Sequence, residues 1–523
     1  MKYGKWKCLS LLASVVALGM PLCLAAQDTA SQDNEAKYHK YKLFDLGTFG
    51  GPASYLNQGQ NILNNHGTLV GAADTATPDP VANQNFCYQF DCFLSHATEI
   101  EDGRVTDLGV LTGGGASSAV WISGNGLIAG ISQNGEMDPL LVGWPVNHAV
   151  LWKKGEIIDL GTLGGGYESF SSAVNNRGQV VGFAVNTTPD AYSLAYGALF
   201  PTQTRAFLWD NGVMRDLDTL GGPDAFALQI NERSQVVGYS YTNSTPNPTT
   251  GVPTADPFLW EDGKMRDLGT LGGTLGVALL INKHGLVVGG SNLAGDATFH
   301  PFLWQDGVMT DLGTLGGGTG TPEWLNELGV ISGKADLAGP KPQNHHAVLW
   351  EDGKITDLGV LPGDSCSNAF FVNNHGQAVG GSSDRNDCTL QVSGHAVLWQ
   401  HGAPAVDLNK LVVPGPSLYM TYAYSINERG EIAGVGVDGG CTAETYEICG
   451  HAYMLIPCDD THLEVAGCEY DLVDAAVASS NEKVLTPSTP SAASAVANTI
   501  TKKAAMRARF AHGYHLPSPG PSN

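Results

Sequence analysis

Glycine is the residue type whose repeated spacing first suggests a binding site in this chain. The stretch DLGTLGGG occurs at residues 159–166 and again, letter for letter, at 311–318. A glycine-rich loop cradles phosphate when it leads into a helix N-terminus and supplies a Lys or Ser/Thr at fixed spacing. No GK[ST] follows either copy, and the next residues have the composition of a strand. We therefore interpret the glycines as a crossing between strands and predict no cofactor there.

Histidine recurs just before an apolar AVLW-type segment. Catalytic metal sites need several ligands that converge on one point, and one histidine per repeat does not provide them. We expect each histidine to bond a backbone carbonyl of its own repeat, and we mark the doublet His345-His346 for a metal-binding test. The recurring histidines are His96, His148, His300, His346, His395 and His451.

The aspartate of the glycine motif also recurs, which raises the question of calcium. Calcium needs six to eight oxygens around one point, usually from a DxDxDG run, and this chain has one motif aspartate per repeat. We expect these aspartates to accept hydrogen bonds from turn amides, so calcium is left unsupported and no metal ligand is predicted. The sequence contains no HExxH, GxSxG or SxxK pattern, and we nominate no catalytic residue.

Aromatic residues form two groups. One group shares a single position in the repeat and indicates packing between neighbouring sheets; it comprises Trp152, Trp209, Trp260, Trp304, Trp350 and Trp399. Three further tryptophans lie outside this register, and two tyrosines lie in a long loop. We predict these as candidate ligand-binding aromatics: Trp121, Trp144, Trp324, Tyr192 and Tyr196.

Cysteine usage points to disulfides. Cys8 and Cys23 lie in the apparent leader, so eight cysteines remain, and an even number in an exported chain favours disulfides over metal sites. Proximity predicts local pairs, among about 105 connectivities that eight cysteines allow. The predicted pairs are Cys87–Cys92, Cys366–Cys388, Cys441–Cys449 and Cys458–Cys468.

The elements that must position these residues follow from the repeat itself. Its motif aspartate returns every 44 to 62 residues, from Asp45 to Asp407. Residues 171–219 show four short apolar segments, which we name a, b, c and d in order, separated by turn residues. An Asn followed three residues later by Gly marks the a-to-b turn, and WxxG marks the c-to-d turn. Segments enriched in Val, Ile, Phe and Trp, apolar on both faces, indicate strands of covered sheets.

The count of segments predicts an all-β, eight-bladed β-propeller of four-stranded blades over residues 41–457. The chain opens on a lone segment d, from Leu43, and ends on a, b and c, at Leu455. The N-terminal strand would therefore complete the last sheet and remove an exposed edge. Seven blades is the alternative, because residues 96–100 of the first unit depart from the HAVLW pattern.

The combination HAVLWxxGxxxDLGTLGG, intact at residues 148–165 and nearly so at 346–363, resembles the HAF family of probable extracellular repeat proteins. The resemblance covers residues 41–457 and implies export and propeller-like β repeats, with no assigned activity. The departures are the weak first unit, Asp218 in place of the motif glycine, and DLNKL from Asp407.

The ends of the chain differ from the repeat. Residues 1–26 read as a signal peptide and residues 27–40 as a linker. Residues 458–474 are expected to form a disulfide-linked closing segment, and residues 475–523 a low-complexity, mostly disordered tail with a short basic helix. We expect a secreted or periplasmic protein, monomeric and without a membrane span.

The net charge of the chain limits the classes of partner that it can bind. The net charge of −24 becomes about −27 when Lys2, Lys5 and Lys7 leave with the leader, which opposes binding to nucleic acid or anionic membranes. Long loops fall between segments b and c, at the same end of each sheet as the d-to-a connections, and variable loops on a rigid frame commonly carry binding. We expect a binding scaffold for an unknown protein or carbohydrate ligand. The alternative is a secreted hydrolase or lyase that acts on polysaccharide.

Overall fold

Each repeat folds as an antiparallel meander, and residues 169–216 illustrate why. In this computed structural model β11 (Ser169–Val174), β12 (Val180–Pro189), β13 (Thr202–Asp210) and β14 (Val213–Asp216) pair in sequence order. The predicted all-β class and the four-stranded antiparallel sheets are confirmed. The structure describes residues 37–80, 91–101, 103–140, 143–194, 202–339, 344–384, 394–400, 403–413, 418–439, 441 and 446–479. The predicted leader, most of the linker and the tail beyond residue 479 lie outside these ranges, as do Cys87, Cys388 and Tyr196.

Turn chemistry explains where the strands end. In the a-to-b turns the Asn side chain accepts the amide two residues on, as from His66 to Asn64 Oδ1 at 2.9 Å, which confirms the predicted turn. In the c-to-d turns two successive residues take positive φ, for example Asp262 at 51° and Gly263 at 77°. Such a pair makes a type I′ turn, whose twist matches the flanking strands of a tight hairpin.

Seven further four-stranded groups accompany this one, and we number all eight as units 1 to 8 by the order of their first strand from β3. Three of them, units 4 to 6, are joined by the single bridges Ala255–Leu275 and Phe299–Thr319. Unit 1 contains β3 (Gly50–Tyr55), β4 (Leu69–Pro78), β5 (Phe93–Glu101) and β6 (Arg104–Asp107), and unit 2 contains β7 (Ser117–Ile122), β8 (Ile128–Met137), β9 (Pro145–Lys153) and β10 (Glu156–Asp159). Unit 4 contains β15 (Ala225–Ile230), β16 (Val236–Pro246), β17 (Pro253–Glu261) and β18 (Lys264–Asp267), and unit 5 contains β19 (Gly272–Ile281), β20 (Val287–Leu293), β21 (Phe299–Gln305) and β22 (Val308–Asp311). Unit 6 contains β23 (Gly316–Leu325), β24 (Ile331–Leu337), β25 (His345–Glu351) and β26 (Lys354–Gly359), and unit 7 contains β27 (Cys366–Val372), β28 (Gln377–Ser383), β29 (His395–Gln400) and β30 (Val406–Asp407).

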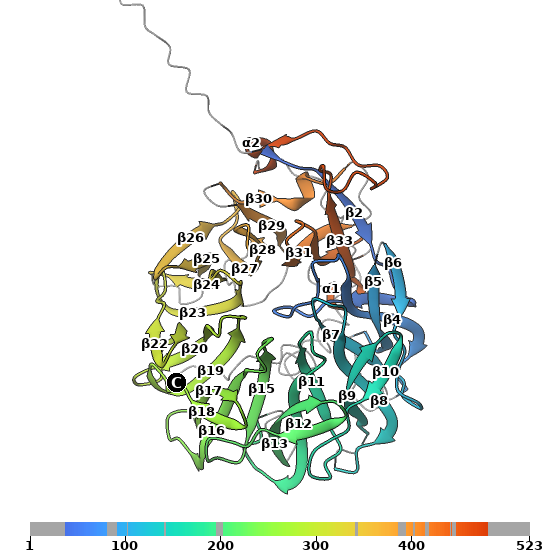
Figure 1. The fold of residues 1–523 in the computed structure, drawn as a ribbon. Coiled ribbons are helices and arrows are strands. Elements are labelled where there is room, and N and C mark those ends of the chain that lie inside the picture. The colour runs from blue at the N-terminus through green and yellow to red at the C-terminus, as the bar shows by residue number, and fades with distance from the viewer. Residues whose placement is uncertain are drawn as a thin grey trace, which may run out of the picture. The chain divides into compact units, whose positions relative to one another are not determined.

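Unit 8 combines the two ends of the repeat region. Its strands β31 (Tyr419–Ile426), β32 (Ile432–Val437) and β33 (His451–Pro457) are followed in the sheet by β2 (Tyr41–Asp45). The register pairs Leu43 with Leu455, and Figure 1 shows β2 beside β33. The N-terminal strand therefore supplies the outer strand of the last four-stranded sheet.

Asparagine side chains link the a-to-b turns of successive units. Asn231 Nδ2 donates to the Asn282 carbonyl at 3.0 Å, and Asn282 donates in turn to Asn326. Equivalent bonds run from Asn175, Asn326 and Asn373, each to the next unit. Asn61 and Asn125 provide the links from unit 1 to unit 2 and from unit 2 to unit 3. A further bond of the same type joins Asn427 in unit 8 to the Asn64 carbonyl in unit 1, also at 3.0 Å.

The tryptophans of segment c pack between units, as predicted. Trp350 and Trp399 are 1 % exposed, and Trp152 is 2 % exposed. The indole of Trp152 also donates to the Leu108 carbonyl of the preceding unit at 2.9 Å, and that of Trp350 donates to the Gly313 carbonyl. Trp152 and Trp350 therefore combine burial of a large apolar ring with a bond across the unit boundary, whereas the indole nitrogen of Trp399 has no hydrogen-bond partner.

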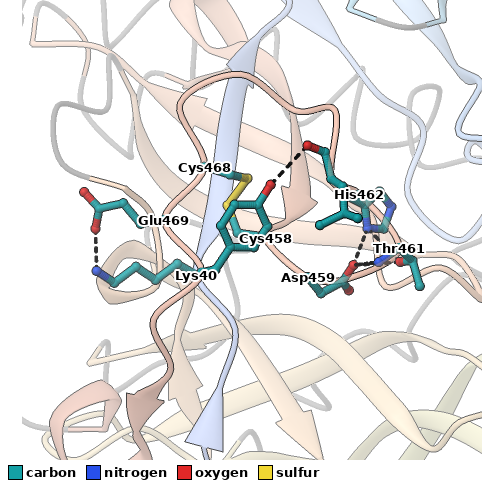
Figure 2. Close-up of a disulfide and its surroundings, with 9 residues drawn as sticks. Lys40, Cys458, Asp459, Thr461, His462, Cys468 and Glu469 are labelled. Carbon is teal, nitrogen blue, oxygen red and sulfur yellow. Dashed lines mark hydrogen bonds and ion pairs between the residues drawn. A yellow bond between two sulfur atoms is a disulfide. The ribbon is translucent and has the colours of Figure 1, made fainter.

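The closing segment after β33 ties both ends of the described chain together. Cys458 and Cys468 form a disulfide with their Cα atoms 5.4 Å apart, Lys40 pairs with Glu469, and buried His462 bonds Asp459 Oδ1 at 2.8 Å, as Figure 2 shows. The end of the predicted linker forms β1 (Lys37–Tyr38), which pairs with β34 (Val473–Asp474). The single-turn helix α2 (Ala475–Ala478) lies where the sequence predicted tail. Two other short elements are η2 (Leu408–Lys410) and α1 (Tyr446–Cys449).

Candidate functional site

The recurring histidines and motif aspartates bind each other. His148 Nδ1 lies 2.9 Å from Asp159, and the same pair forms in four other units, including His451 with Asp45 at 3.0 Å. The c–d register places the two residues on one face of the sheet, which is why the partner is a carboxylate where the sequence predicted a carbonyl of the same repeat. The other three of these pairs are His96–Asp107, His300–Asp311 and His346–Asp357.

Three units depart from this pairing. In unit 4, Asp256 takes the place of the histidine, and burial together with the charge of Asp267 raises its pKa to about 6. Arg205 replaces the histidine in unit 3 and bonds Asp216 with two nitrogens. In unit 7, His395 pairs with Asp364 at 3.2 Å. The aspartates also accept turn amides as predicted, for example that of Gly161 at 2.8 Å on Asp159. Among the described residues, no group of three or more His, Cys, Asp or Glu side chains is arranged to hold a metal ion.

Two of the predicted ligand-binding aromatics pack against each other, Trp121 buried and Trp324 half-buried. Trp121 is 7 % exposed, and its ring centroid lies 6.1 Å from that of Trp324, which stacks on Phe371 at 4.0 Å. These three rings come from segment a of units 2, 6 and 7. All three directly precede the apolar residue before the a-to-b turn, so an alignment of the turns could have identified them as one structural position. The strands place that position inside, where Trp324 contacts several apolar clusters.

The other predicted aromatics lie nearer the loops. Trp144 is half-buried, and its carbonyl accepts the amide of Asp138 at 2.8 Å. Tyr192 packs against a row of rings in units 3 and 4, where Phe183 and Phe226 have centroids 4.1 Å apart. The structure therefore brings Trp121 and Trp324 together and places Trp144 and Tyr192 apart from them, at loop positions. Tyr196 lies outside the described residues.

Beside Trp324 the apolar pattern is interrupted by charge. The carboxylate of Glu323 accepts a bond from Asn368 Nδ2 at 3.0 Å. Burial raises the pKa of Glu323, and the charge of Lys334 together with bonds from Asn368 and Gln58 opposes that rise. Units 6 and 7 thus hold an ionisable group at a position where several other units have apolar side chains.

A pocket opens next to this group at the loop ends of units 6 and 7. Lys334 and His345 contribute from one unit, Asn368 from the next, and Tyr422 from unit 8. The remaining lining residues are Cys366, Ser367, Phe370, Gly381, Ser382 and Ser383. Sequence reasoning had singled out two of these residues, Cys366 for a disulfide and His345 for a metal-binding test. The signal it missed is that Lys334 is the one cation in segment b, where units 3 and 4 have Phe183 and Tyr239.

Buried carboxyl groups lie at the same ends of the sheets in units 1 to 4. Asp74 is fully buried, and burial together with a hydrogen bond to Asp91 raises its pKa to about 9. Burial raises the pKa of Asp224 to about 8, with Asp190 beside it. Burial also raises the pKa of Glu168 well above its usual range. In each case a loop acid adds negative charge to a carboxyl group that water does not reach.

Disulfides hold the loops and the closing segment. Cys441–Cys449 and Cys458–Cys468 form as predicted. Cys92 and Cys366 are also disulfide-bonded, and their predicted partners lie outside the described residues. No helix in the described part of the chain has the length and apolar character needed to cross a membrane.

Comparison with known proteins yields structural likeness at low identity. No family model and no curated protein matches the chain. Among solved structures, a Pyrococcus horikoshii acylaminoacyl peptidase is similar with a TM-score of 0.41 and 11 % identity, over 75 % of this chain and 59 % of that one. The β-propeller domain of the trilobed protease from Pyrococcus furiosus has a TM-score of 0.39 and 9 % identity, over 71 % and 95 % of the two chains. Porphyromonas gingivalis dipeptidyl peptidase 4 has a TM-score of 0.40 and 10 % identity, over 67 % and 54 %. The chain thus spans about 59 % of the acylaminoacyl peptidase.

Proposed function

We propose that residues 41–457 form a closed propeller of eight blades, one for each four-stranded unit, within the HAF-type extracellular repeats. Two features support closure: β2 completes the sheet of β31 to β33, and the Asn427–Asn64 bond continues the links between successive turns. Closure in this way leaves no sheet edge open at the junction. Two disulfides fit the secreted or periplasmic location that the leader predicts.

We propose further that the protein is a binding scaffold whose ligand is a saccharide, bound in the pocket between units 6 and 7. The observation that carries this is a contrast between equivalent places in the fold. In units 3 and 4 the space is filled by stacked rings, such as Phe226 and Tyr239 at 5.6 Å. In units 6 and 7 it holds Glu323, Lys334 and Asn368 beside an open pocket. Charged groups cost stability where rings would pack, so their presence indicates a function.

The chemistry of the pocket suits sugar hydroxyls. The ammonium of Lys334 donates, the Asn368 amide donates and accepts, and the hydroxyl groups of Ser367 and Ser382 do both. The carboxylate of Glu323 does not line the pocket and accepts a bond from Asn368. Because Lys334 and Glu323 oppose each other in charge, the site favours a neutral, hydroxyl-rich ligand over a strongly charged one. Phe370 and Tyr422 supply apolar ring surface for the C–H faces of a pyranose.

A glycan array probed with the purified full chain tests this proposal. We expect binding to a defined set of glycans, and a loss of at least about tenfold in affinity for Lys334→Ala, which removes a charged hydrogen-bond donor. Lys354→Ala is the matched control, because Lys354 is an exposed lysine of the same unit. Equal binding by both variants, or an absence of glycan binding, contradicts the proposal.

A second candidate is a hydrolase or lyase that acts on the same class of ligand. Burial raises the pKa of Glu323, and an upward shift is the direction that a carboxyl group needs to serve as a general acid. Glycans bound in the array are incubated with the protein and their products analysed. Catalysis would be established if the wild-type protein cleaves the glycans and Glu323→Gln abolishes cleavage but not binding. Glycans that stay intact would contradict catalysis and support only the scaffold function.

A further inference from the structure

A second group of polar side chains lies where unit 2 meets unit 3, away from the pocket described above. Asp138 follows β8 at the start of the b-to-c loop, and Asn147 lies in β9 after that loop. Glu168 precedes β11, the first strand of unit 3. Their exposed fractions are 4 %, 2 % and 0 %, so the three side chains are buried.

Two oxygen atoms of this group have no hydrogen-bond partner. Glu168 Oε2 accepts the Asn147 amide at 2.9 Å, whereas Glu168 Oε1 accepts nothing. The Asn147 side-chain nitrogen donates to the Pro145 carbonyl at 3.0 Å, and Asn147 Oδ1 accepts nothing. Asp138 Oδ1 accepts the Leu140 amide at 2.6 Å, and the Asp138 charge acts on Glu168. Glu168 Oε1 and Asn147 Oδ1 are thus two buried acceptors without a donor, and the negative charge of Asp138 acts on Glu168.

Buried acceptors in this state are costly, and a bound cation removes the cost. The unpartnered atoms are oxygens of the Glu168 carboxyl group and of the Asn147 amide, and the charge of the Asp138 carboxylate acts on Glu168. Oxygen is the donor type that calcium prefers over zinc. We propose that Asp138, Asn147 and Glu168 form a calcium site that fastens the b-to-c loop of unit 2 to the first strand of unit 3. Water molecules would complete the coordination.

The next junction, between units 3 and 4, also buries a carboxyl group, that of Asp224. Both oxygens of Asp224 accept backbone amides, from Thr204 at 3.0 Å and Leu194 at 2.6 Å. Asp190 lies beside this carboxyl group, and Asp190 Oδ2 has no hydrogen-bond partner. The Asp190–Asp224 pair retains a proton because burial raises the pKa of Asp224 to about 8. It therefore offers a cation one unpaired oxygen, where Glu168 and Asn147 offer two. The two junctions therefore provide a site and a matched control within one chain.

The test measures calcium binding to the chelator-treated, purified full chain by calorimetry. Binding is expected with a Kd of about 10⁻⁴ to 10⁻³ M, the range of extracellular modules. Glu168→Gln and Asp138→Asn should each weaken binding by at least about tenfold, because ligand charge sets affinity. Asp190→Asn should leave it unchanged. Because Glu168→Gln keeps the amide-accepting oxygen, it is expected to fold, and thermal unfolding with and without calcium checks this for every variant.

Terbium emission excited through tryptophan provides a second readout, because Trp144 lies in the loop that Asp138 begins. Trp144→Phe should reduce this emission while calcium affinity stays the same. Failure of wild-type protein to bind calcium or terbium overturns the proposal, as does equal loss in Glu168→Gln and Asp190→Asn. Neither result depends on glycan binding, so the test is independent of the proposed function.

Discussion

Replacement of Asn427 by alanine tests whether the last unit is joined to the first. The Asn427 side chain makes four hydrogen bonds: its oxygen accepts Arg429 and Glu431 amides at 3.0 Å, and its nitrogen donates to the Asn64 carbonyl and to Glu431. At about 1 kcal/mol net for each bond, the substitution should lower the free energy of unfolding by about 3–5 kcal/mol. The bond to Asn64 spans 363 residues of sequence, so it exists only if the ends of the repeat region meet.

Asn231→Ala is the matched control for this substitution. Asn231 makes the same four bonds, to Arg233, to Gln235 twice, and to the Asn282 carbonyl of the next unit. Chemical denaturation, with hydrogen exchange of β2 and β33 as a local readout, should give the two variants losses equal within about 1 kcal/mol. Exchange should rise at β2 only in Asn427→Ala. Only the bond to Asn64 crosses between the ends of the repeat region, because the other three bonds of Asn427 lie within its own turn. Unchanged exchange of β2 in Asn427→Ala would therefore refute end-to-end closure.

Four further outcomes follow from the same contacts. Trp324→Ala should cost about 3–5 kcal/mol in denaturant unfolding, because a large ring packed against several clusters is lost, and a cost near zero would show that the ring is not interior. The bond between His451 and Asp45 raises the pKa of His451 and lowers the pKa of Asp45, although burial alone would raise the latter. The pair should therefore stabilise the β2–β33 junction most between these two pKa values, and lose that effect above the raised pKa of His451 and below the lowered pKa of Asp45. His451→Gln should make the hydrogen exchange of β2 less dependent on pH, and an unchanged pH profile contradicts the pairing. Since Asp224 keeps its proton up to a pKa of about 8 when folded, stability should fall as pH rises from about 4 to about 8, and Asp190→Asn should make thermal unfolding less pH-dependent over that window. Removal of the Cys441–Cys449 or the Cys458–Cys468 disulfide, each in a double Cys→Ser variant, should lower the free energy of unfolding by about 2–3 kcal/mol. An unchanged unfolding midpoint would contradict a stabilising role of that disulfide.

Local regularities made much of the fold predictable. The Asn-x-x-Gly and WxxG turns specify tight hairpins through side-chain acceptance and positive φ, both of which act within a few residues. Repetition of these turns fixed the number and order of strands in each sheet. Proximity also identified the two disulfides whose cysteines are described, Cys441–Cys449 and Cys458–Cys468.

The candidate sites were harder to predict because their residues are brought together by packing between units. Glu323 and Asn368 are 45 residues apart, and Glu168 meets a loop that begins 30 positions earlier, at Asp138. Spacing alone suggested that Trp121 and Trp324 would face a ligand. The direction in which segment a points decided that they meet each other instead.

The sequence by itself determined the strands, their turns and the pairing of near cysteines, since those depend on backbone preference over short distances. The tertiary structure decided which histidines meet carboxylates, which tryptophans are interior and which oxygens remain unpaired. Those outcomes depend on the register between strands and on the distance between units, and neither is encoded in any single repeat. Lys334 and Glu323 show the difference: each breaks a repeated pattern in the sequence, but only the packed sheets place them beside one pocket.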